Sequence, residues 1–427
     1  MDQGRKTVGV IGAGVVGVLA ATFLQRAGHD VFIVDPNNPG EGASFGNAGC
    51  LNASSVVPMS MPGTIKNVPR WLTDPMGPLV VRWSYLPALA PWLLRFIAAG
   101  TPDRVRAQAR ALRPLIAPSI EILTSLLKEE AADGLVQRVG HLFVYRSHES
   151  WQKERLAWDL RRENGITWDE LDANELRQVE PNLSRDYVKG VVIRENGHTT
   201  NPHRLVKTLL ERFLHDGGRI ERTRAVGFDV DGSRLRAIRT QDGLRSADAA
   251  VVAAGIWSRP LAGELGDKLP LETERGYHLM IRDPEVIPRM PITDAEGKFV
   301  VTPMELGLRA AGTVELAGLR APPNWERARV LLSHLRRMFP ALNETYADDR
   351  VSNWMGHRPS LPDSLPVIGP SRRSPDVIYA FGHGHIGMAS APMTGRLVAE
   401  LVTGQPASID IAPFAPGRFA YSPTPGS

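Results

Sequence analysis

A glycine-rich turn near the N-terminus constrains the fold of this chain more than any other feature. An apolar run over residues 8–11 leads into the turn GAGVVG at residues 12–17, and a helical pattern follows over residues 18–27. A second apolar run, residues 31–34, ends at Asp35. Strand, glycine turn, helix, strand and acidic residue, in that order, are typical of a βαβ unit that binds a dinucleotide.

The residues of the turn each have a physical role in such a unit. Gly12 permits the tight turn, Gly14 lets a pyrophosphate approach the backbone, and Gly17 lets the helix pack close to its strand. Val15 and Val16 belong to the turn before the predicted helix, where exposed N–H groups and the helix dipole favour phosphate charges. The turn therefore predicts a phosphate site made of main chain.

The acidic residue at the end of the second strand narrows the choice of dinucleotide. Asp35 lies close to the expected spacing of about 20 residues and is placed to hold a ribose hydroxyl. Its charge disfavours the 2′-phosphate of NADP. The motif alone does not separate FAD from NAD, and a buried βαβ unit without a ligand is the alternative.

Composition excludes several classes of partner. A chain of 427 residues with 43% hydrophobic and 22% charged residues is expected to form two globular domains. Its 50 Lys and Arg against 46 Asp and Glu give a net charge of only +4, and no basic run is interleaved with aromatic residues, so we expect no nucleic-acid partner. The single cysteine, Cys50, excludes an intrachain disulfide and a cysteine-cluster metal site, and we expect no metal.

The apolar segments do not predict a targeting or membrane-spanning helix. The first apolar run is interrupted by the glycine turn. The longest apolar region, residues 79–100, contains Arg82, Pro87, Pro91 and Arg95 and is a poor membrane span. We therefore expect a cytoplasmic protein.

Nucleotide-type elements recur in the middle and at the end of the chain. The apolar strand 249–253 enters the small-residue turn Ala254-Gly255, and the strand 377–381 enters a glycine turn at 382–387 before a helix from about Pro392. Antiparallel-type segments lie between them. The pattern predicts an α/β fold (α+β overall), with a discontinuous Rossmann-type FAD- or NAD-binding domain and an inserted antiparallel-sheet substrate domain. The expected cofactor domain spans 1–60, 197–263 and 349–415, the substrate domain 61–196 and 264–348, and a flexible tail 416–427.

Other elements follow from periodicity and punctuation. Residues 58–100, rich in Pro and Trp, are expected to be irregular and partly buried, or else a surface for membrane or quinone contact. Residues 356–369, around Arg358, are expected to be a Pro-rich loop. Helices are predicted over 104–131 (interrupted near Pro114 and Pro118), 150–165, 173–179, 203–215 and 325–339, and strands over 141–145 and 188–193.

Taken in order, the motifs of this chain resemble the D-amino acid oxidase-like superfamily of FAD-dependent oxidoreductases, and within it the small subunits of D-amino acid dehydrogenases. The resemblance covers residues 6–414. Its markers are VGVIGAGVVG with Asp35, SFGNAG (44–49), VVAAGIWS (251–258), AGTVELAG (311–318), GHRPSLPDSLPVIG (356–369) and GHGHIG (382–387).

The resemblance implies FAD as the cofactor and assigns residues to it. The residues implied for cofactor binding, besides those of the first turn, are Ser44, Asn47, Ala48, Gly49, Ala254, Gly255, Gly384, His385, Ile386, Gly387 and Met388. The final helix would direct its N-terminus at the flavin, where negative charge develops on reduction. Cys50 follows the flavin loop, but the chain lacks the C-terminal cysteine of members with a covalent flavin.

The same resemblance implies substrate-site residues. Arg358 matches the arginine that pairs with the substrate carboxylate, a task that suits a guanidinium. Tyr277 and His278 follow Gly276 in a segment expected to border the site, with core packing as the alternative. His385 is the candidate for proton transfer, against a purely main-chain role for its turn.

The implied reaction is hydride transfer from Cα of a D-amino acid to flavin, and water then releases a 2-oxo acid and ammonia. The expected acceptor is a quinone or another electron-transfer partner, with peripheral contact at the inner membrane through residues 58–100. The alternatives are an oxygen-using oxidase of glycine, sarcosine or another secondary amine, a 2-hydroxy acid dehydrogenase, and a non-catalytic flavoprotein.

Overall fold

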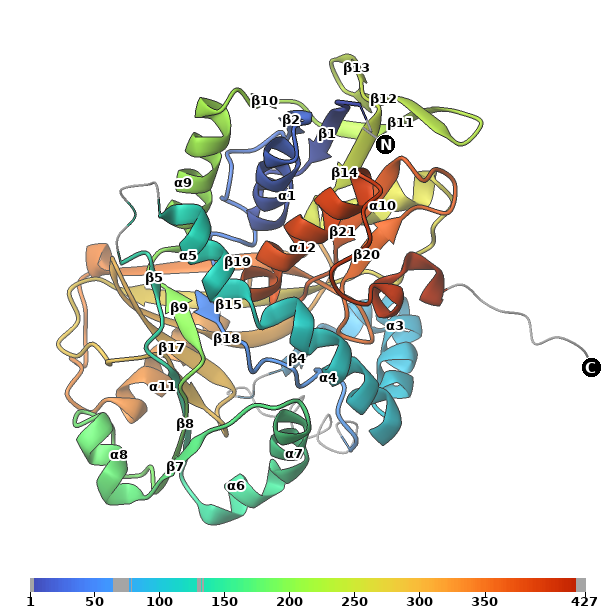
Figure 1. Ribbon diagram of the computed structural model, residues 1–427. Coiled ribbons are helices and arrows are strands. Elements are labelled where there is room, and N and C mark those ends of the chain that lie inside the picture. The colour runs from blue at the N-terminus through green and yellow to red at the C-terminus, as the bar shows by residue number, and fades with distance from the viewer. Residues whose placement is uncertain (1–3, 64–76, 78, 129–131, 133, 420–427) are drawn as a thin grey trace, which may run out of the picture.

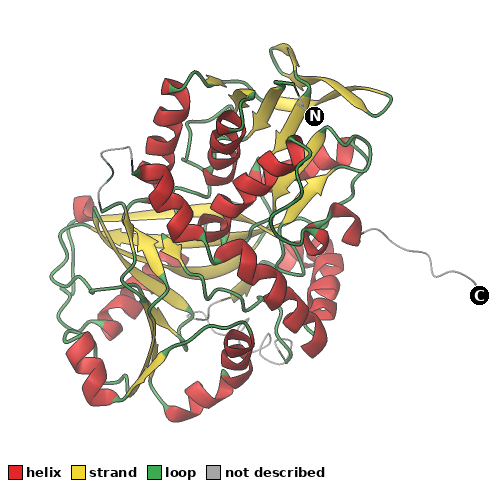
Figure 2. Cartoon of the chain, in the orientation of Figure 1, coloured by secondary structure: helices red, strands yellow, loops and turns green. Residues whose placement is uncertain are grey.

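The computed structural model describes residues 4–63, 77, 79–128, 132 and 134–419. Two large sheets, of six and nine strands, organise the chain. Figure 1 shows the blue N-terminal elements with the six-stranded sheet in the upper part of the view and the nine-stranded sheet below, and Figure 2 shows helices packed around both. The mixed α/β fold expected from the sequence is confirmed.

The six-stranded sheet takes its strands from the start, middle and end of the chain. Its order is β10-β2-β1-β14-β21-β20, and every neighbouring pair is parallel except β20 with β21. The bounds are β1 Thr7–Ile11, β2 Asp30–Val34, β10 Arg219–Glu221, β14 Ala249–Val252, β20 Val367–Pro370 and β21 Val377–Phe381.

Alternation along these strands gives each face of the sheet its own core. Val8 and Val10 of β1 pack toward the helices α1, α9 and α12, whereas Ile11 packs toward a three-stranded sheet and α10 on the other face. Both faces are therefore covered, as parallel sheets require. The covering elements are α1 Val15–Arg26, α9 Pro202–His215, α12 Gly387–Val402, β11 Ala225–Asp231, β12 Arg234–Thr240, β13 Gly243–Ser246 and α10 Ser258–Glu264.

The nine-stranded sheet has the order β19-β15-β18-β17-β16-β6-β8-β7, with β4 paired to β18. Its core packs against α8 and α11. The bounds are β4 Leu79–Val81, β6 His141–Tyr145, β7 Asp169–Leu171, β8 Lys189–Ile193, β15 Glu272–Ile281, β16 Ile292–Asp294, β17 Phe299–Met304, β18 Gly307–Leu316, β19 Val351–Ser360, α8 Ala173–Val179 and α11 Glu326–Met338.

A small sheet and five further helices complete the described chain. The small sheet, in the order β3-β9-β5, joins segments that lie far apart in sequence, and α4 and α5 pack on α12. The bounds are β3 Cys50–Leu51, β5 Val136–Gln137, β9 Gly197–Thr199, α3 Leu86–Ala99, α4 Pro102–Ile116, α5 Ser119–Leu127, α6 His148–Lys153 and α7 Arg155–Glu163. Within the described residues, no helix is both long and apolar enough to cross a membrane.

The prediction of a Pro-rich loop around Arg358 is wrong. Arg358 lies in β19, a ten-residue strand that pairs along its whole length with β15. Pro359 is tolerated because β19 is the edge strand of its sheet, so that one side of it needs no ladder N–H. The two-domain division stays a proposal, and this pairing leads us to propose that the substrate domain extends to residue 360.

Several predicted boundaries also need correction. The helix predicted over 150–165 is two helices that meet at Glu154, and the final helix begins at Gly387, before Pro392. The segment predicted to be irregular contains β4 and the 14-residue helix α3, while its residues 64–76 and 78 lie outside the described chain. Residues 416–419 of the predicted tail form a short 3-10 helix, in which Arg418 pairs with Asp363, and the rest lies outside the described residues.

Candidate active site

One cavity of about 1910 Å³ connects the carboxyl ends of β1 and β2 with the nine-stranded sheet. Four of the predicted site residues, Gly17, Gly49, Tyr277 and His278, do not line it. The cavity brings together the other predicted residues, which are Gly12, Gly14, Val15, Val16, Asp35, Ser44, Asn47, Ala48, Ala254, Gly255, Arg358, Gly384, His385, Ile386, Gly387 and Met388.

The glycines of the first turn allow main-chain groups to approach one another closely. Gly12 has φ +112°, and a Cβ on it would lie 2.5 Å from the carbonyl oxygen of Ala253. A Cβ on Gly17 would lie 1.8 Å from the carbonyl oxygen of Gly12, so Gly17 serves packing and not the cavity surface. Gly14 precedes α1, which therefore begins at the cavity wall with its N–H groups available to an anion.

Asp35 and Ser44 brace this turn. The Asp35 carboxylate accepts hydrogen bonds from the N–H groups of Ala13 and Asn37, each at 2.8 Å. Ser44 Oγ accepts from the N–H of Val15 at 3.0 Å, which brings the 44–49 loop to the start of α1. Both side chains also line the cavity, so they can bind a ligand as well as hold the turn.

The 44–49 loop is held from the nine-stranded sheet. Arg309 of β18 donates to the carbonyl oxygens of Phe45 at 3.2 Å and Asn47 at 2.6 Å. Gly46 lies flat against Trp354 of β19, since a Cβ on it would come within 1.9 Å of the ring. Sequence reasoning missed Arg309 and Trp354, because an arginine and a tryptophan within strands give no local sign of a distant loop.

His278 belongs to this support and not to the cavity. Its Nδ1 lies 3.1 Å from the carbonyl oxygen of Gly46, and its ring stacks on Trp354 with centroids 5.3 Å apart. Burial, with a smaller contribution from Arg309, lowers the pKa of His278 to about 3, so the ring is neutral at pH 7. The structure therefore places His278 where it supports the 44–49 loop, and not on the cavity surface, where its predicted catalytic role would require it.

Tyr277 lies on the other face of its strand. Glu274 and Gly276 of β15 face the cavity side, and alternation turns Tyr277 away. Its hydroxyl donates to Glu315 at 2.5 Å and accepts from the N–H of Asn324 at 2.9 Å. The position of Tyr277 therefore agrees with the alternative interpretation, in which this side chain packs in the core and does not border the site.

The turn before α12 forms a second main-chain wall. Gly384 has φ +52° and donates its N–H to the carbonyl oxygen of Pro359 at 2.9 Å, which ties the turn to β19. His383 is buried, with Nε2 3.1 Å from Thr394 Oγ1. The His385 side chain is exposed to the cavity, where desolvation by the enclosing protein and then the charge of Arg358 lower its pKa to about 4.

Arg358 presents a mostly buried cation to the same cavity. It lies directly opposite Glu274 in the β15–β19 ladder, and its Nη1 donates to the carbonyl oxygen of Thr313 at 3.3 Å. A Cβ on Gly276 would lie 2.3 Å from Arg358 Cζ, so the guanidinium packs over this glycine. Burial raises the pKa of Glu274, an effect that Arg358 opposes. Among the described residues, no carboxylate oxygen comes within the 4.0 Å of an ion pair with Arg358.

Cys50 also lines the cavity, and burial raises the pKa of its thiol to about 12. A thiol with that pKa is protonated near neutral pH and is a poor nucleophile. The raised pKa therefore disfavours the thiolate that a covalent flavin link would need.

Comparison with known proteins now assigns the family. The sequence pattern described as DAO, FAD dependent oxidoreductase, matches residues 7–401. The chain belongs to this family. It is therefore an FAD-dependent oxidoreductase, and the cavity fits FAD in that two helix N-termini, an acidic residue and glycines without room for a Cβ face one continuous cavity.

The relatives divide between two kinds of oxidoreductase. A protein of Bradyrhizobium diazoefficiens named D-amino-acid oxidase is 46% identical over 98% of this chain and 100% of its own length. A D-amino acid dehydrogenase of Paramagnetospirillum magneticum is 32% identical over 96% of this chain and 98% of its own.

Solved structures share the fold. A glycine oxidase from Geobacillus kaustophilus has a TM-score of 0.74 at 22% identity and covers 98% of this chain and 100% of its own. An L-proline dehydrogenase from P. horikoshii has a TM-score of 0.74 at 18% identity and covers 97% and 98%. At such low identity the likeness extends to the fold alone.

Proposed function

We propose that this protein oxidises D-amino acids at Cα to imino acids, which water hydrolyses to 2-oxo acids and ammonia. The observation that carries the proposal is Arg358, a mostly buried cation on the cavity wall without a carboxylate partner among the described residues. Whole-length relatives named D-amino-acid oxidase and D-amino acid dehydrogenase support the choice of substrate.

We assign the cofactor to the main-chain end of the cavity. The N-terminus of α1, with Gly12 and Gly14, would hold the pyrophosphate, and Asp35 would hold a ribose hydroxyl. The 44–49 loop and the turn before α12 would line the flavin, with Ala254 and Gly255 as a further wall. When bound, FAD supplies a two-electron acceptor for the hydride that leaves Cα.

The chain itself contributes orientation and charge. Arg358 would bind the substrate carboxylate through two parallel N–H···O bonds, which fixes the direction of Cα. The N-terminus of α12 opens on the same cavity, where its partial positive charge favours a group that becomes negative on reduction. His385 is our candidate for proton transfer, although its lowered pKa makes the neutral ring a weak base that is better suited to accept a hydrogen bond from the substrate amine.

The electron acceptor is a second part of the proposal. The 46% identity to a protein named an oxidase favours oxygen, whereas the dehydrogenase relatives are less similar. One structural feature favours a quinone at a membrane instead: Trp83 and Leu94, beside and within α3, are 68% and 69% exposed.

The visible spectrum of the holoprotein under anaerobic conditions tests the proposal. We expect D-amino acids to bleach the flavin band, and L-amino acids, glycine, sarcosine and 2-hydroxy acids to leave it unchanged. Bleaching by one of the latter groups alone would replace the proposed substrate by that group. Readmitted oxygen that restores the band at turnover rate, with peroxide formed, assigns an oxidase, and restoration only by a short-chain quinone assigns a dehydrogenase.

A further inference from the structure

A second arginine reaches the cavity from α7. Arg161 lines the cavity and is only 9% exposed. Its Nε is buried and has no hydrogen-bond partner, and its Nη1 makes one long contact of 3.4 Å to the carbonyl oxygen of Ala157 in its own helix. A buried guanidinium with so few partners is costly unless a ligand completes it.

Two aromatic rings hold this guanidinium in place. The Arg161 Cζ lies 4.4 Å from the ring centroid of Trp158 and 5.1 Å from that of Phe143. These contacts stabilise a cation and restrict its movement. They offer no oxygen to its N–H groups, whose hydrogen-bonding capacity stays available.

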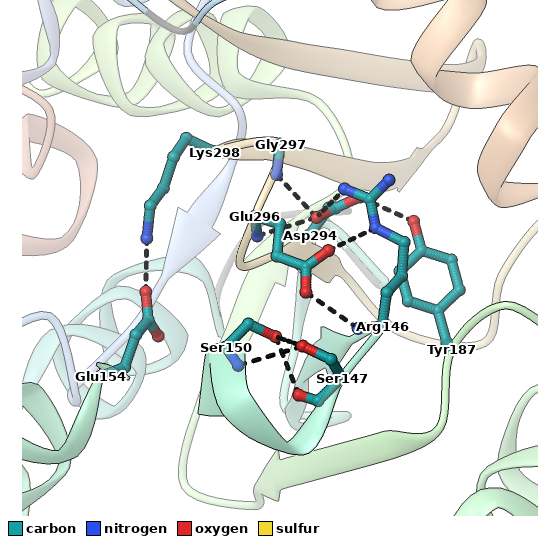
Figure 3. Close-up of polar contacts among 9 residues, drawn as sticks. All are labelled: Arg146, Ser147, Ser150, Glu154, Tyr187, Asp294, Glu296, Gly297 and Lys298. Atoms are coloured by element: carbon teal, nitrogen blue, oxygen red, sulfur yellow. Dashed lines mark hydrogen bonds and ion pairs between the residues drawn. The ribbon is translucent and has the colours of Figure 1, made fainter. Parts of the chain in front are cut away.

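The nearest carboxylate is committed elsewhere. Glu154 forms an ion pair with Lys298 and accepts a hydrogen bond from Tyr145 Oη at 2.8 Å. Figure 3 shows Lys298 and Glu154 directed at one another across the space between the β16–β17 turn and the junction of α6 with α7. Glu154 influences Arg161 only from beyond ion-pair distance.

Two further carboxylates in this region are also paired. Arg146 contacts Asp294 at 3.5 Å and Glu296 at 2.5 Å, and Tyr187 donates its hydroxyl to Asp294 at 2.7 Å (Figure 3). Within the described chain, no carboxylate forms an ion pair with Arg161.

The cavity wall beside Arg161 includes a neutral histidine, His141, among other hydrogen-bonding groups. His141 Nδ1 lies 3.1 Å from Asn52 Nδ2, and His141 Nε2 lies 2.7 Å from Thr293 Oγ1. Burial and then the charges of His198 and Arg161 lower the pKa of His141 to about 3. The cavity is also lined by Lys153, Glu154 and Lys298, but Lys153 is paired with Glu149 and Lys298 with Glu154. Arg161 therefore differs from these two lysines in having no carboxylate ion-pair partner among the described residues.

Sheet geometry separates Arg161 from Arg358. Arg358 reaches the carbonyl oxygen of Thr313 on β18, whereas Arg161 lies over Phe143 on β6. In the order β18-β17-β16-β6 these strands are three spacings apart, which is roughly 14 Å at about 4.8 Å per strand. A short acidic amino acid cannot reach both guanidinium groups, but a longer one can.

We propose that Arg161 forms a second anion subsite, which binds the side-chain carboxylate of a long acidic D-amino acid while Arg358 binds its α-carboxylate. The inference rests on the proposed function, because it extends the substrate from its α-carboxylate outward. The subsite sets specificity and takes no part in the hydride transfer.

A chain-length series tests the subsite. We expect kcat/KM to rise along D-aspartate, D-glutamate, D-2-aminoadipate and D-2-aminopimelate, and the best of the longer acids to exceed a neutral D-amino acid of equal length by at least about tenfold. Equal values for acidic and neutral substrates at every length would overturn the inference while leaving D-amino acid oxidation intact. Bleaching by no D-amino acid would instead overturn the proposed function.

Variants separate recognition from packing. Arg161→Met keeps an apolar stem between the two rings, and we expect it to abolish the acidic preference while kcat/KM for neutral D-amino acids changes less than threefold. Arg161→Lys should retain part of the preference. Arg162→Met, an exposed neighbour paired with Asp159, is the matched control and should retain all of it. An equal loss for acidic and neutral substrates in Arg161→Met would show a structural role only.

A binding measurement without turnover gives an independent readout. Adipate or pimelate should shift the flavin absorption band of the holoprotein at lower concentration than hexanoate does, and Arg161→Met should remove that difference. If Arg161→Met does not fold, the wild-type comparison of adipate with hexanoate and the Arg161→Lys variant still decide the question. Equal binding of the two ligands by the wild type would contradict the subsite.

Discussion

The two ends of the cavity are built from different parts of the polypeptide. Around α1 and α12, the walls are main chain, and glycines such as Gly12 and Gly17 are placed where a Cβ would overlap a carbonyl group. At the nine-stranded sheet and the neighbouring α7, the walls are side chains, and they include Arg358 and Arg161, two cations without a carboxylate ion-pair partner among the described residues. A main-chain site depends on glycines, which have no Cβ, and these positions tolerate almost no substitution. A side-chain site depends on which face each strand position takes, so specificity can change there while the fold stays the same.

The strongest way to break the main-chain end is Gly17→Ala. The new Cβ would lie 1.8 Å from the Gly12 carbonyl oxygen, so β1 and α1 must separate and the phosphate site is lost. We expect protein that retains less than about a tenth of its FAD, measured as visible absorbance per protein. Gly263→Ala, in α10 with nothing within 4 Å of its Cβ, should retain all of it. Full FAD content in Gly17→Ala would show that the helix start is not the phosphate site.

Arg358→Met tests the side-chain end. Loss of two charge-assisted hydrogen bonds should reduce kcat/KM for D-amino acids by about 10²- to 10³-fold. FAD content and the melting temperature should stay near wild type, because the hydrogen bond of Arg358 to the described protein is one long contact to the carbonyl oxygen of Thr313, and methionine keeps the apolar stem over Gly276. A reduction below threefold would remove Arg358 from the substrate site.

Gly276→Ala tests whether the absence of a Cβ also matters at the side-chain end of the cavity. Its Cβ would overlap the Arg358 guanidinium at 2.3 Å from Cζ, and the flexible arginine must move aside. We expect KM to rise about tenfold with kcat nearly unchanged. In a double-mutant cycle, Gly276→Ala should add nothing to Arg358→Met. Additive effects would mean that Gly276 acts through another contact.

The smallest expected effect is a pH dependence of stability. Burial raises the pKa of Glu180 to about 7 from 4.5, although it accepts a hydrogen bond from the N–H of Arg289 at 2.7 Å. The folded state therefore binds this proton more tightly than the unfolded state, and the resulting stability is present below about pH 4.5 and lost as the pH rises through 7. Glu180→Gln should reduce the fall in melting temperature between pH 5 and pH 8 by roughly 2–4 °C. Identical slopes in the two proteins would contradict the shift.

The contrast between the two ends also explains what the sequence could predict. The glycine turn and Asp35 are local in sequence, so their spacing alone indicated the βαβ unit that the structure contains. Arg358 was found by resemblance, but Pro359 suggested a loop because the edge position of β19 depends on the whole sheet. Tyr277 was predicted to border the site because the sequence does not determine which face of the strand each residue occupies. A shift of one residue moves every side chain to the opposite face of the sheet.

Arg161 and Arg309 gave no signal at all in the sequence. Arg161 lies in a helix whose two other arginines, Arg155 and Arg162, are exposed and paired with Asp159 on the surface. Arg309 supports a loop far from it in sequence, because its hydrogen-bond partner Asn47 lies 262 residues earlier in the chain. Their roles follow only from the cavity and from the partners that the fold brings to them.

The central place of β1 in its sheet has a consequence for how the protein is made. Residues 7–11 are synthesised well before residues 249–252, which form one neighbour of β1, and before residues 377–381, which form the strand beyond that neighbour. One edge of β1 is therefore open while the residues between β1 and β14 are being made, and an open edge is a template for association with other chains. The last wall of the cavity, α12, ends at residue 402. FAD can be enclosed only after α12 has been made, so the bound cofactor cannot protect the open edge of β1 while the residues before α12 are being synthesised.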